Sequence, residues 1–155
     1  LLCNADVDNR AQWESAVGAF YEKWRSDPLV FEKWMRARMY ADKEGIDVLG
    51  SLRQIQALPE YNPKGQSSIG RLWGAFGANP VHFHKSDGSG YEALAAEVAR
   101  VDTFNHEFAA HLAHPFIVLN KLAEPYRGAM KRAVQQLAAT PGLSADVLDK
   151  VKPLL

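Results

Sequence analysis

The sequence predicts an all-α protein built from paired antiparallel helices. Each segment with a readable hydrophobic pattern repeats with the period of a helix, and no segment shows the sustained alternation of a strand. The expected helices also fall into pairs that recur along the chain. We therefore expect a right-handed superhelix, or α-solenoid, of about eight helices.

Four helices are expected in the first half of the chain, over residues 13–24, 28–39, 48–55 and 69–76. Asp27 and Pro28 begin the second of them, because Asp accepts hydrogen bonds from free amides and Pro fits the first turn. The third ends before Pro59. The apolar faces consist of Trp13, Val17, Phe20 and Trp24; of Phe31, Trp34, Met35 and Met39; of Val48, Leu52 and Ile55; and of Ile69, Leu72, Trp73 and Phe76.

Four more helices are expected over residues 91–98, 104–112, 125–137 and 144–154. A proline at position 115 interrupts the second of these, and a short apolar segment over 116–119 follows it. Asn105 and Ser144 are typical N-cap residues. The apolar faces consist of Tyr91, Leu94, Ala95 and Val98; of Phe104, Phe108 and Leu112; of Tyr126, Met130, Ala133, Val134 and Leu137; and of Val147, Val151 and Leu154.

The spacing of these helices indicates a repeat. The pairs begin near residues 10, 47, 90 and 125, at intervals of roughly 35–42 residues, which is the range of HEAT and armadillo repeats. Such arrays bury their core between neighbouring pairs and leave a concave surface for a partner. We expect residues 1–155 to form a single helical-repeat domain.

The composition excludes several classes of function. Of 155 residues, 18 are basic and 18 acidic, which gives no electrostatic basis for binding nucleic acid or an anionic membrane. No apolar run is long enough to cross a bilayer. The single cysteine, Cys3, cannot form an internal disulfide, which favours a reducing, cytoplasmic location. The chain starts at Leu1 without an initiator methionine, and we expect it to be a fragment of a longer protein.

Candidate metal ligands fail on spacing. His106-Glu107-Phe108-Ala109-Ala110-His111 resembles the zinc motif His-Glu-x-x-His but is one residue too long. Histidines five residues apart diverge by about 140° around a helix, against about 40° in the working motif. His82 and His84 would share one face of an extended segment, but no third ligand has an obvious spacing. We expect no metal site in this chain.

Other catalytic patterns are equally weak. Gly88-Ser89-Gly90 lacks the strand before it and the Gly-Lys-Ser/Thr ending of a phosphate loop. The glycines fit a sharp turn into the next helix, with Asp87 or Ser89 as its cap. No Ser-His-Asp or Cys-His arrangement can be assembled.

A series of motifs in the same order resembles one known family. They are Phe20-Tyr21 with Trp24, Asp27-Pro28-Leu29-Val30, Lys33-Trp34, Asn62-Pro63, Gly74-Ala75-Phe76, Asn79-Pro80, Phe83-His84, Gly88-Ser89-Gly90-Tyr91, Asn105, Pro115-Phe116, Asn120-Lys121-Leu122 and Met130. Together they are similar to the second half of the C-terminal helical domain of zinc-dependent aminopeptidase N enzymes, of the gluzincin class. Leu119-Asn120-Lys121-Leu122 is most similar to apicomplexan members.

The resemblance implies a four-domain peptidase that removes N-terminal amino acids from peptides. Its zinc would be held by a thermolysin-like domain that this chain lacks, so the chain itself would have no cofactor and no catalytic residue. The helical domain would cover the active site and limit access to small peptides. Its partners would be the catalytic domain of the same polypeptide and peptide substrates.

The resemblance also implies substrate-binding residues. In the family, the second residue after the Asn of the sixth helix helps line the pocket for the first substrate side chain, and that residue is Glu107 here. An acid at this helical position also favours the helix dipole, so a purely structural role stays open. A negative charge in this pocket would favour Arg or Lys at the peptide N-terminus.

Two further positions depart from the family pattern. The family often carries Arg where this chain has Gly70, with Arg71 next to it, and a shift of one residue rotates a side chain by about 100°. A second Arg of the family is His111 here, which unlike Arg can titrate near neutral pH. Arg71 and His111 are therefore candidate substrate contacts. The alternative function is a stand-alone helical-repeat module that binds a peptide or protein on its concave face.

Overall fold

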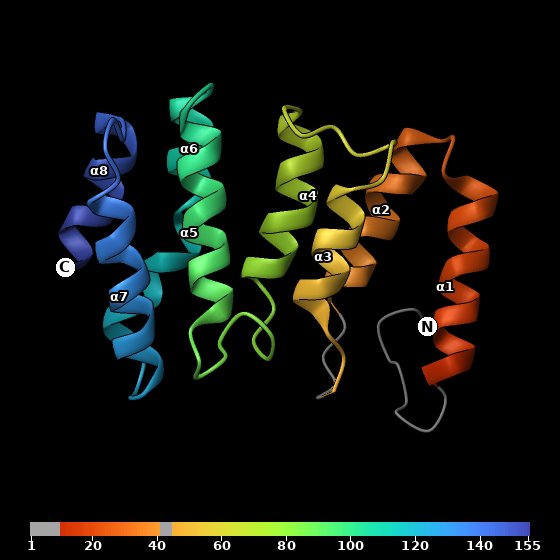
Figure 1. Ribbon diagram of the computed structural model, residues 1–155, viewed down its shortest axis with the longest axis horizontal. Helices are drawn as coiled ribbons and strands as arrows, with labels where there is room; N and C mark the ends of the chain where they lie inside the picture. Colours follow the sequence, from red (N-terminus) through yellow and green to blue (C-terminus); the bar gives the residue numbers. More distant parts are fainter. Residues whose placement is uncertain (1–9, 41–44) are drawn as a thin grey trace. The chain divides into compact units, whose positions relative to one another are not determined.

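The computed structural model describes residues 10–40 and 45–155, and all regular structure in these ranges is helical. Cys3 lies outside the described residues. The α-helices are α1 (Arg10–Trp24), α2 (Pro28–Met39), α3 (Val48–Gln56), α4 (Gln66–Gly77), α5 (Ser89–Asp102), α6 (His106–Leu112), α7 (Tyr126–Ala138) and α8 (Ala145–Val151), as Figure 1 shows. Two 3₁₀ helices, η2 (His114–Lys121) and η3 (Lys152–Leu154), follow α6 and α8. The prediction of an all-α fold with eight helices is confirmed in these ranges.

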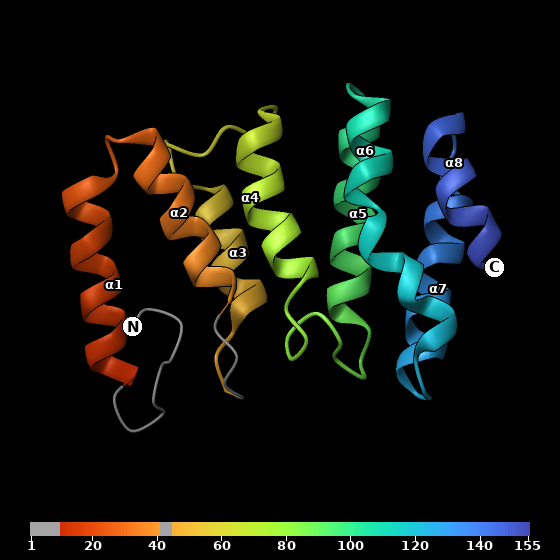
Figure 2. The same ribbon diagram turned by 180° about the vertical axis from the view of Figure 1, so that it is seen from behind.

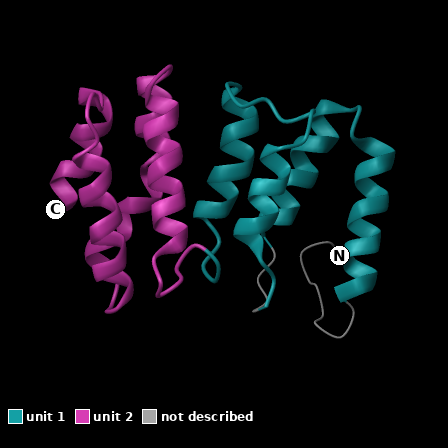
Figure 3. Ribbon diagram, viewed as in Figure 1, with its two compact units in different colours: residues 1–82 teal, residues 83–155 magenta. Residues whose placement is uncertain are grey.

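The chain divides into two compact units, residues 1–82 and 83–155 (Figure 3). In the first unit, α2 packs against both α3 and α4. In the second unit, α5 packs against α6 and α7, while α6 packs against α8. Figure 2 shows α2 beside α4 and α6 beside α8 from behind. Contacts between helices one and two places apart in the chain are those of a helical repeat.

Local sequence sets where most of these helices begin. Asp27 accepts hydrogen bonds from the amides of Leu29 and Val30 at 3.0 and 3.1 Å, and Pro28 occupies the first turn of α2. Asn105 and Ser144 cap α6 and α8 as predicted. Capping oxygens satisfy amides that have no partner inside the helix, which is worth about 1 kcal/mol each.

The entry into α5 differs from the prediction. Its N-cap is Gly88, with φ of 81°, and neither Asp87 nor Ser89 caps it. Asp87 instead accepts a hydrogen bond from the Ser89 amide at 2.9 Å, which shapes the turn just before the helix. A Cβ at Gly88 would lie 3.3 Å from the Ala129 Cβ on α7. Glycine is therefore required here both by the left-handed backbone and by close helix packing.

Each unit has its own apolar core. In the first unit, Met35, Leu52, Ile69 and Phe76 are fully buried. In the second, Phe83 packs edge-on against Tyr91 at 5.1 Å between ring centroids and also contacts Phe116. All three rings are fully buried, and burial of each stabilises the fold by about 1.5–3 kcal/mol.

Three aromatic residues assigned to buried helical faces are exposed instead. Phe104 precedes α6 rather than belonging to it, and it is 38% exposed. Trp24 and Tyr126, at the ends of α1 and α7, are also exposed. Leu112 is buried on α6 as predicted, and Ala109 and Ala110 are buried with it. Small side chains on that face allow α6 to approach α5 and α8 closely, which a stripe of phenylalanines would prevent.

A buried asparagine explains the Asn79-Pro80 motif. The Asn79 amide group donates to the Met39 carbonyl at the end of α2, at 2.8 Å. Its side-chain oxygen accepts from the backbone amides of Val81 and His82, each at 2.9 Å. One side chain thus ties the segment after α4 to α2. Among the described residues, no helix is long and apolar enough to cross a membrane.

Candidate functional site

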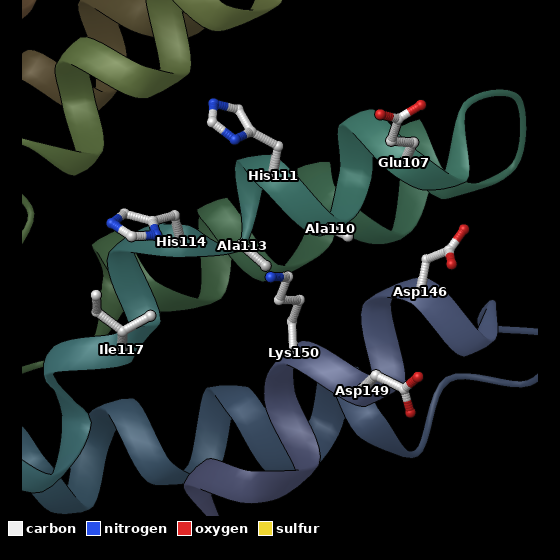
Figure 4. Close-up of a pocket in the computed structure, with 9 residues that line it drawn as sticks. All are labelled: Glu107, Ala110, His111, Ala113, His114, Ile117, Asp146, Asp149 and Lys150. Atoms are coloured by element: carbon white, nitrogen blue, oxygen red, sulfur yellow. The ribbon is translucent and has the colours of Figure 1, made fainter.

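The second unit contains an open cleft of about 870 Å³ between α6 and α8, here called the α6–α8 cleft (Figure 4). It combines acidic, basic and imidazole side chains with a few small apolar ones. The lining residues are Glu107, Ala110, His111, Ala113, His114, Ile117, Asp146, Asp149 and Lys150.

The α6 wall carries two of the three predicted substrate contacts. The Asn105 side chain accepts from the Phe108 amide at 3.0 Å and starts the helix there, which makes Glu107 its second residue. His111 follows one turn later, and its ring stacks against Phe108 with a centroid distance of 6.4 Å. Glu107 and His111 are both exposed and line the same cleft. The structure therefore brings these two together.

The position of Glu107 is compatible with both interpretations that the sequence left open, and its contact with substrate stays a prediction. Its carboxylate is near the N-terminus of α6, where the helix dipole favours a negative charge. It also lines the α6–α8 cleft, where a ligand would meet it. The two roles use the same charge and do not compete.

The α8 wall is held in place by a buried carboxylate from α5. Asp102 is 3% exposed and accepts hydrogen bonds from the Ser144 amide at 2.7 Å and the Ser144 hydroxyl at 2.5 Å. Ser144 is the N-cap of α8, and its hydroxyl oxygen accepts from the Val147 amide. The position of α8 opposite α6 is thus fixed by a residue that does not itself line the cleft.

Asp102 stays ionised despite its burial. Burial by itself raises the pKa of this carboxyl, but hydrogen bonds from Ser144 and from His106 lower it, and the net shift is downward. A carboxylate that accepts several hydrogen bonds is stabilised in its charged form. The hydrogen bonds to Ser144 are therefore charge-assisted at neutral pH.

The two histidines of the near-miss zinc motif diverge as expected. His106 Nδ1 lies 3.1 Å from Asp102 Oδ1, whereas His111 lines the α6–α8 cleft. In residues 10–40 and 45–155, no three His, Cys, Asp or Glu side chains are grouped so that they could hold a metal ion. The described residues therefore offer no candidate zinc site, and the zinc that the family resemblance implies would be held by a domain outside this chain.

Arg71 belongs to the other unit. It lies on α4 and forms an ion pair with Glu32 of α2, with Nε and Oε2 3.7 Å apart. It also lines a small cavity of about 270 Å³ with Arg36 and Tyr40. Nothing in the first unit alone connects Arg71 with the α6–α8 cleft, so its contact with substrate stays a prediction.

His82 and His84 also fall in different units. His82 is buried, and its backbone amide donates to Asn79. His84 Nδ1 lies 2.9 Å from the Tyr91 hydroxyl. Burial lowers the pKa of His84 and raises the pKa of Tyr91 to about 12. Both groups are therefore neutral near pH 7.

Sequence reasoning missed the other side of the cleft. His114 and Ile117 come from η2, while Asp146, Asp149 and Lys150 come from α8. One signal was available, because charged residues at positions 146, 149 and 150 share one face of a helix. The signal is ambiguous, since solvent-exposed helix faces show the same pattern.

The fold and the cleft define a class of protein, the helical-repeat domain with a polar, ligand-accessible cleft. A family model described as "Domain of unknown function (DUF3458_C) ARM repeats" matches residues 1–155. The chain belongs to this family and is homologous to the C-terminal domain of aminopeptidase N. This confirms the family resemblance and the helical-repeat fold that the sequence predicted.

Individual relatives support the same assignment. The aminopeptidase N of Caulobacter vibrioides is 30% identical over 137 residues, and that of Haemophilus influenzae is 29% identical over 137 residues; each match covers 88% of this chain. The aminopeptidase N of Escherichia coli is 30% identical over 143 residues, or 92% of this chain. This chain spans 16% of the length of each of these relatives.

A solved structure has the same fold. The crystal structure of Legionella pneumophila aminopeptidase A in complex with aspartic acid superposes with a TM-score of 0.84 at 22% identity. The match covers 94% of this chain and 17% of that one. At this identity the similarity supports the fold and carries no argument about ligands.

Proposed function

We propose that this chain is the non-catalytic C-terminal helical domain of a zinc-dependent aminopeptidase N, which removes N-terminal amino acids from peptides. The observation that carries the proposal is the α6–α8 cleft, which brings Glu107 and His111 together in a chain of this family. The zinc and the catalytic groups would belong to another domain of the same polypeptide. A cytoplasmic location is part of the same proposal.

The helical domain acts in this scheme as a wall of the substrate chamber. It covers the active site, limits access to small peptides and contributes to the pocket for the first substrate residue. Glu107 supplies a negative charge that favours Arg or Lys in that pocket. The isolated 155-residue chain should hydrolyse no peptide.

The proposal is tested by Glu107→Gln in the complete aminopeptidase polypeptide. The substitution keeps the shape and removes the charge, so the preference for Arg over Leu at the substrate N-terminus should fall by on the order of fivefold in kcat/KM. Kinetics with a matched pair of Arg and Leu substrates measures the ratio.

Glu92→Gln is a matched control. Glu92 is also an acid in the first turn of a helix, α5, but it does not line the cleft. The control should leave the Arg-to-Leu ratio unchanged. An unaltered ratio in the Glu107 variant would remove the assigned role of this residue. A gene that does not continue into a metallopeptidase domain would favour the stand-alone binding module.

A further inference from the structure

The charges of the α6–α8 cleft are separated rather than mixed. In Figure 4, Glu107, Asp146 and Asp149 stand toward one end of the cleft, while His114 and Ile117 stand at the other. Lys150 lies between them, on the α8 wall. A ligand that lies along the cleft would therefore meet negative charge at one end and a cation further along.

Lys150 is available to a ligand. Its side chain is exposed and extends from α8 toward α6 near Ala113 (Figure 4). Asp146 is one turn earlier on the same helix, at the spacing where ion pairs usually form, yet Lys150 makes no ion pair with any carboxylate in residues 10–40 and 45–155. Its ammonium group is therefore not engaged in an ion pair with these residues.

The α6 side of the cleft is small and apolar beside this cation. Ala110 and Ala113 are nearly buried, at 7% and 3% exposed, and leave room where larger side chains would fill the cleft. Ile117 adds an exposed apolar surface, at 48%. Short aliphatic side chains and a peptide backbone fit such a surface.

The cleft is also organised before any ligand arrives. Ser144, the N-cap of α8, is hydrogen-bonded to the buried Asp102, so the helix that carries Asp146 and Lys150 is anchored at its first turn. A charged side chain on an anchored helix loses less entropy on binding than one on a mobile segment.

We infer that Lys150 binds the free C-terminal carboxylate of a short peptide whose basic N-terminal end faces Glu107 and Asp146. This deepens the proposed function and rests on it for the orientation of the peptide. Asp146 and Lys150 are about 6 Å apart along the helix axis. An extended peptide advances about 3.3–3.6 Å per residue, so two or three residues span the two charges. The ligand class is the short zwitterionic peptide.

The test measures binding to the 155-residue chain, without any hydrolysis. Arg-Ala-Ala and its C-terminal amide are titrated into ¹⁵N-labelled protein, and the backbone amide signals of Ala110, Ala113 and Lys150 are followed by NMR. The free acid should bind on the order of threefold to tenfold more tightly than the amide. In Lys150→Met, which keeps the long side chain and the helix propensity, the two peptides should bind equally.

Lys131→Met is the matched control, because Lys131 is an exposed lysine on α7 that does not line the cleft. It should keep the preference for the free acid. Equal binding of acid and amide to the wild type, an unchanged preference in Lys150→Met, or shifts only outside the cleft would each overturn the inference. The two proposals can fail separately. If the wild type binds the free acid selectively but Glu107→Gln leaves the Arg-to-Leu ratio unaltered, the assigned role of Glu107 is wrong and the Lys150 inference is retained.

Discussion

The two compact units use charged side chains in different ways. In the first unit, one ion pair of the described residues is local, Glu22 with Arg25 at 3.6 Å, and three others connect segments that are distant in the chain. They are Glu14 with Arg38 at 2.9 Å, Arg25 with Glu60 at 3.5 Å, and Glu32 with Arg71 at 3.7 Å. Arg38 also lies 5.0 Å from the centre of the Trp13 ring and donates to the Ser51 hydroxyl. Charge in this unit contributes to holding helices together.

In the second unit, the arginine ion pairs of the described residues are local. Arg100 pairs with Glu97 and Arg127 with Glu124, each three residues away. The long-range polar link is the Asp102–Ser144 pair, and the charges of the α6–α8 cleft are left without ion pairs among the described residues. Paired charges thus contribute to the architecture of the first unit, whereas the unpaired charges around the cleft remain available to a ligand.

The largest expected loss of stability follows from a substitution at Asp102. Asp102→Asn removes the charge that accepts from the amide and hydroxyl of Ser144, and we expect it to lower the free energy of unfolding by about 2–3 kcal/mol at pH 7. Urea denaturation checks this, with Asp149→Asn as a control on the exposed face of α8. A loss no larger than that of the control would show that α8 is held by its apolar contacts alone.

The stability lost in Asp102→Asn should depend on pH. The folded-state pKa of Asp102 is lowered, so its contribution is fully present above the unfolded pKa of about 4 and is lost as the pH falls through the folded value. The stability difference between wild type and Asp102→Asn should therefore narrow in acid. A difference that stays constant down to pH 3 would contradict the assigned charge state.

The first unit is probed at Arg38. Its side chain is only 10% exposed, and Arg38→Met would remove the ion pair with Glu14, the hydrogen bond to Ser51 and the contact with Trp13. We expect a loss of about 1–2 kcal/mol in the free energy of unfolding, smaller in 1 M NaCl because salt screens the ion pair. Arg25→Met, at an exposed pair, should have no measurable effect. A loss in Arg38→Met that is equally small would argue against this unit being held by charge.

The smallest expected effect on stability is at Gly88, where the chain enters α5. Gly88→Ala places a Cβ on a residue with φ of 81° and 3.3 Å from Ala129, and should cost about 1 kcal/mol. Gly18→Ala on α1 meets no atom within 4 Å and should stabilise the protein, since alanine favours a helix. Thermal unfolding of the two variants should shift in opposite directions. A shift in the same direction would show that the backbone at Gly88 relaxes.

The sequence predicted the fold wherever the determining interactions are local. Asp27, Asn105 and Ser144 act within three residues of themselves, and so they locate their helices correctly. Phe104 was wrongly assigned to a buried helical face, because the periodicity of apolar residues does not show which of them a neighbouring element covers. Its ring lies 5.5 Å from the Arg100 guanidinium instead of entering the core. The right-handed course of the repeat and the single domain stay predictions.

Only the α6 side of the candidate site was named from the sequence. Glu107 and His111 came from the family resemblance, and both line one cleft. The α8 wall could not be found, because its position depends on a contact between Asp102 and Ser144 that are 42 residues apart. No local pattern distinguishes an Asp that anchors a distant helix from one that ends its own.

Both α-helical walls of the cleft, α6 and α8, have only seven residues. Isolated segments of that length have almost no helical population in water, because the free-energy cost of nucleating a helix exceeds the stabilisation gained from two turns of hydrogen bonds. The binding surface therefore comes into existence only when the fold around it is complete. A nascent or partly unfolded chain would present Lys150 and its acidic neighbours as scattered charges on a coil, without a cleft for the peptide that we propose.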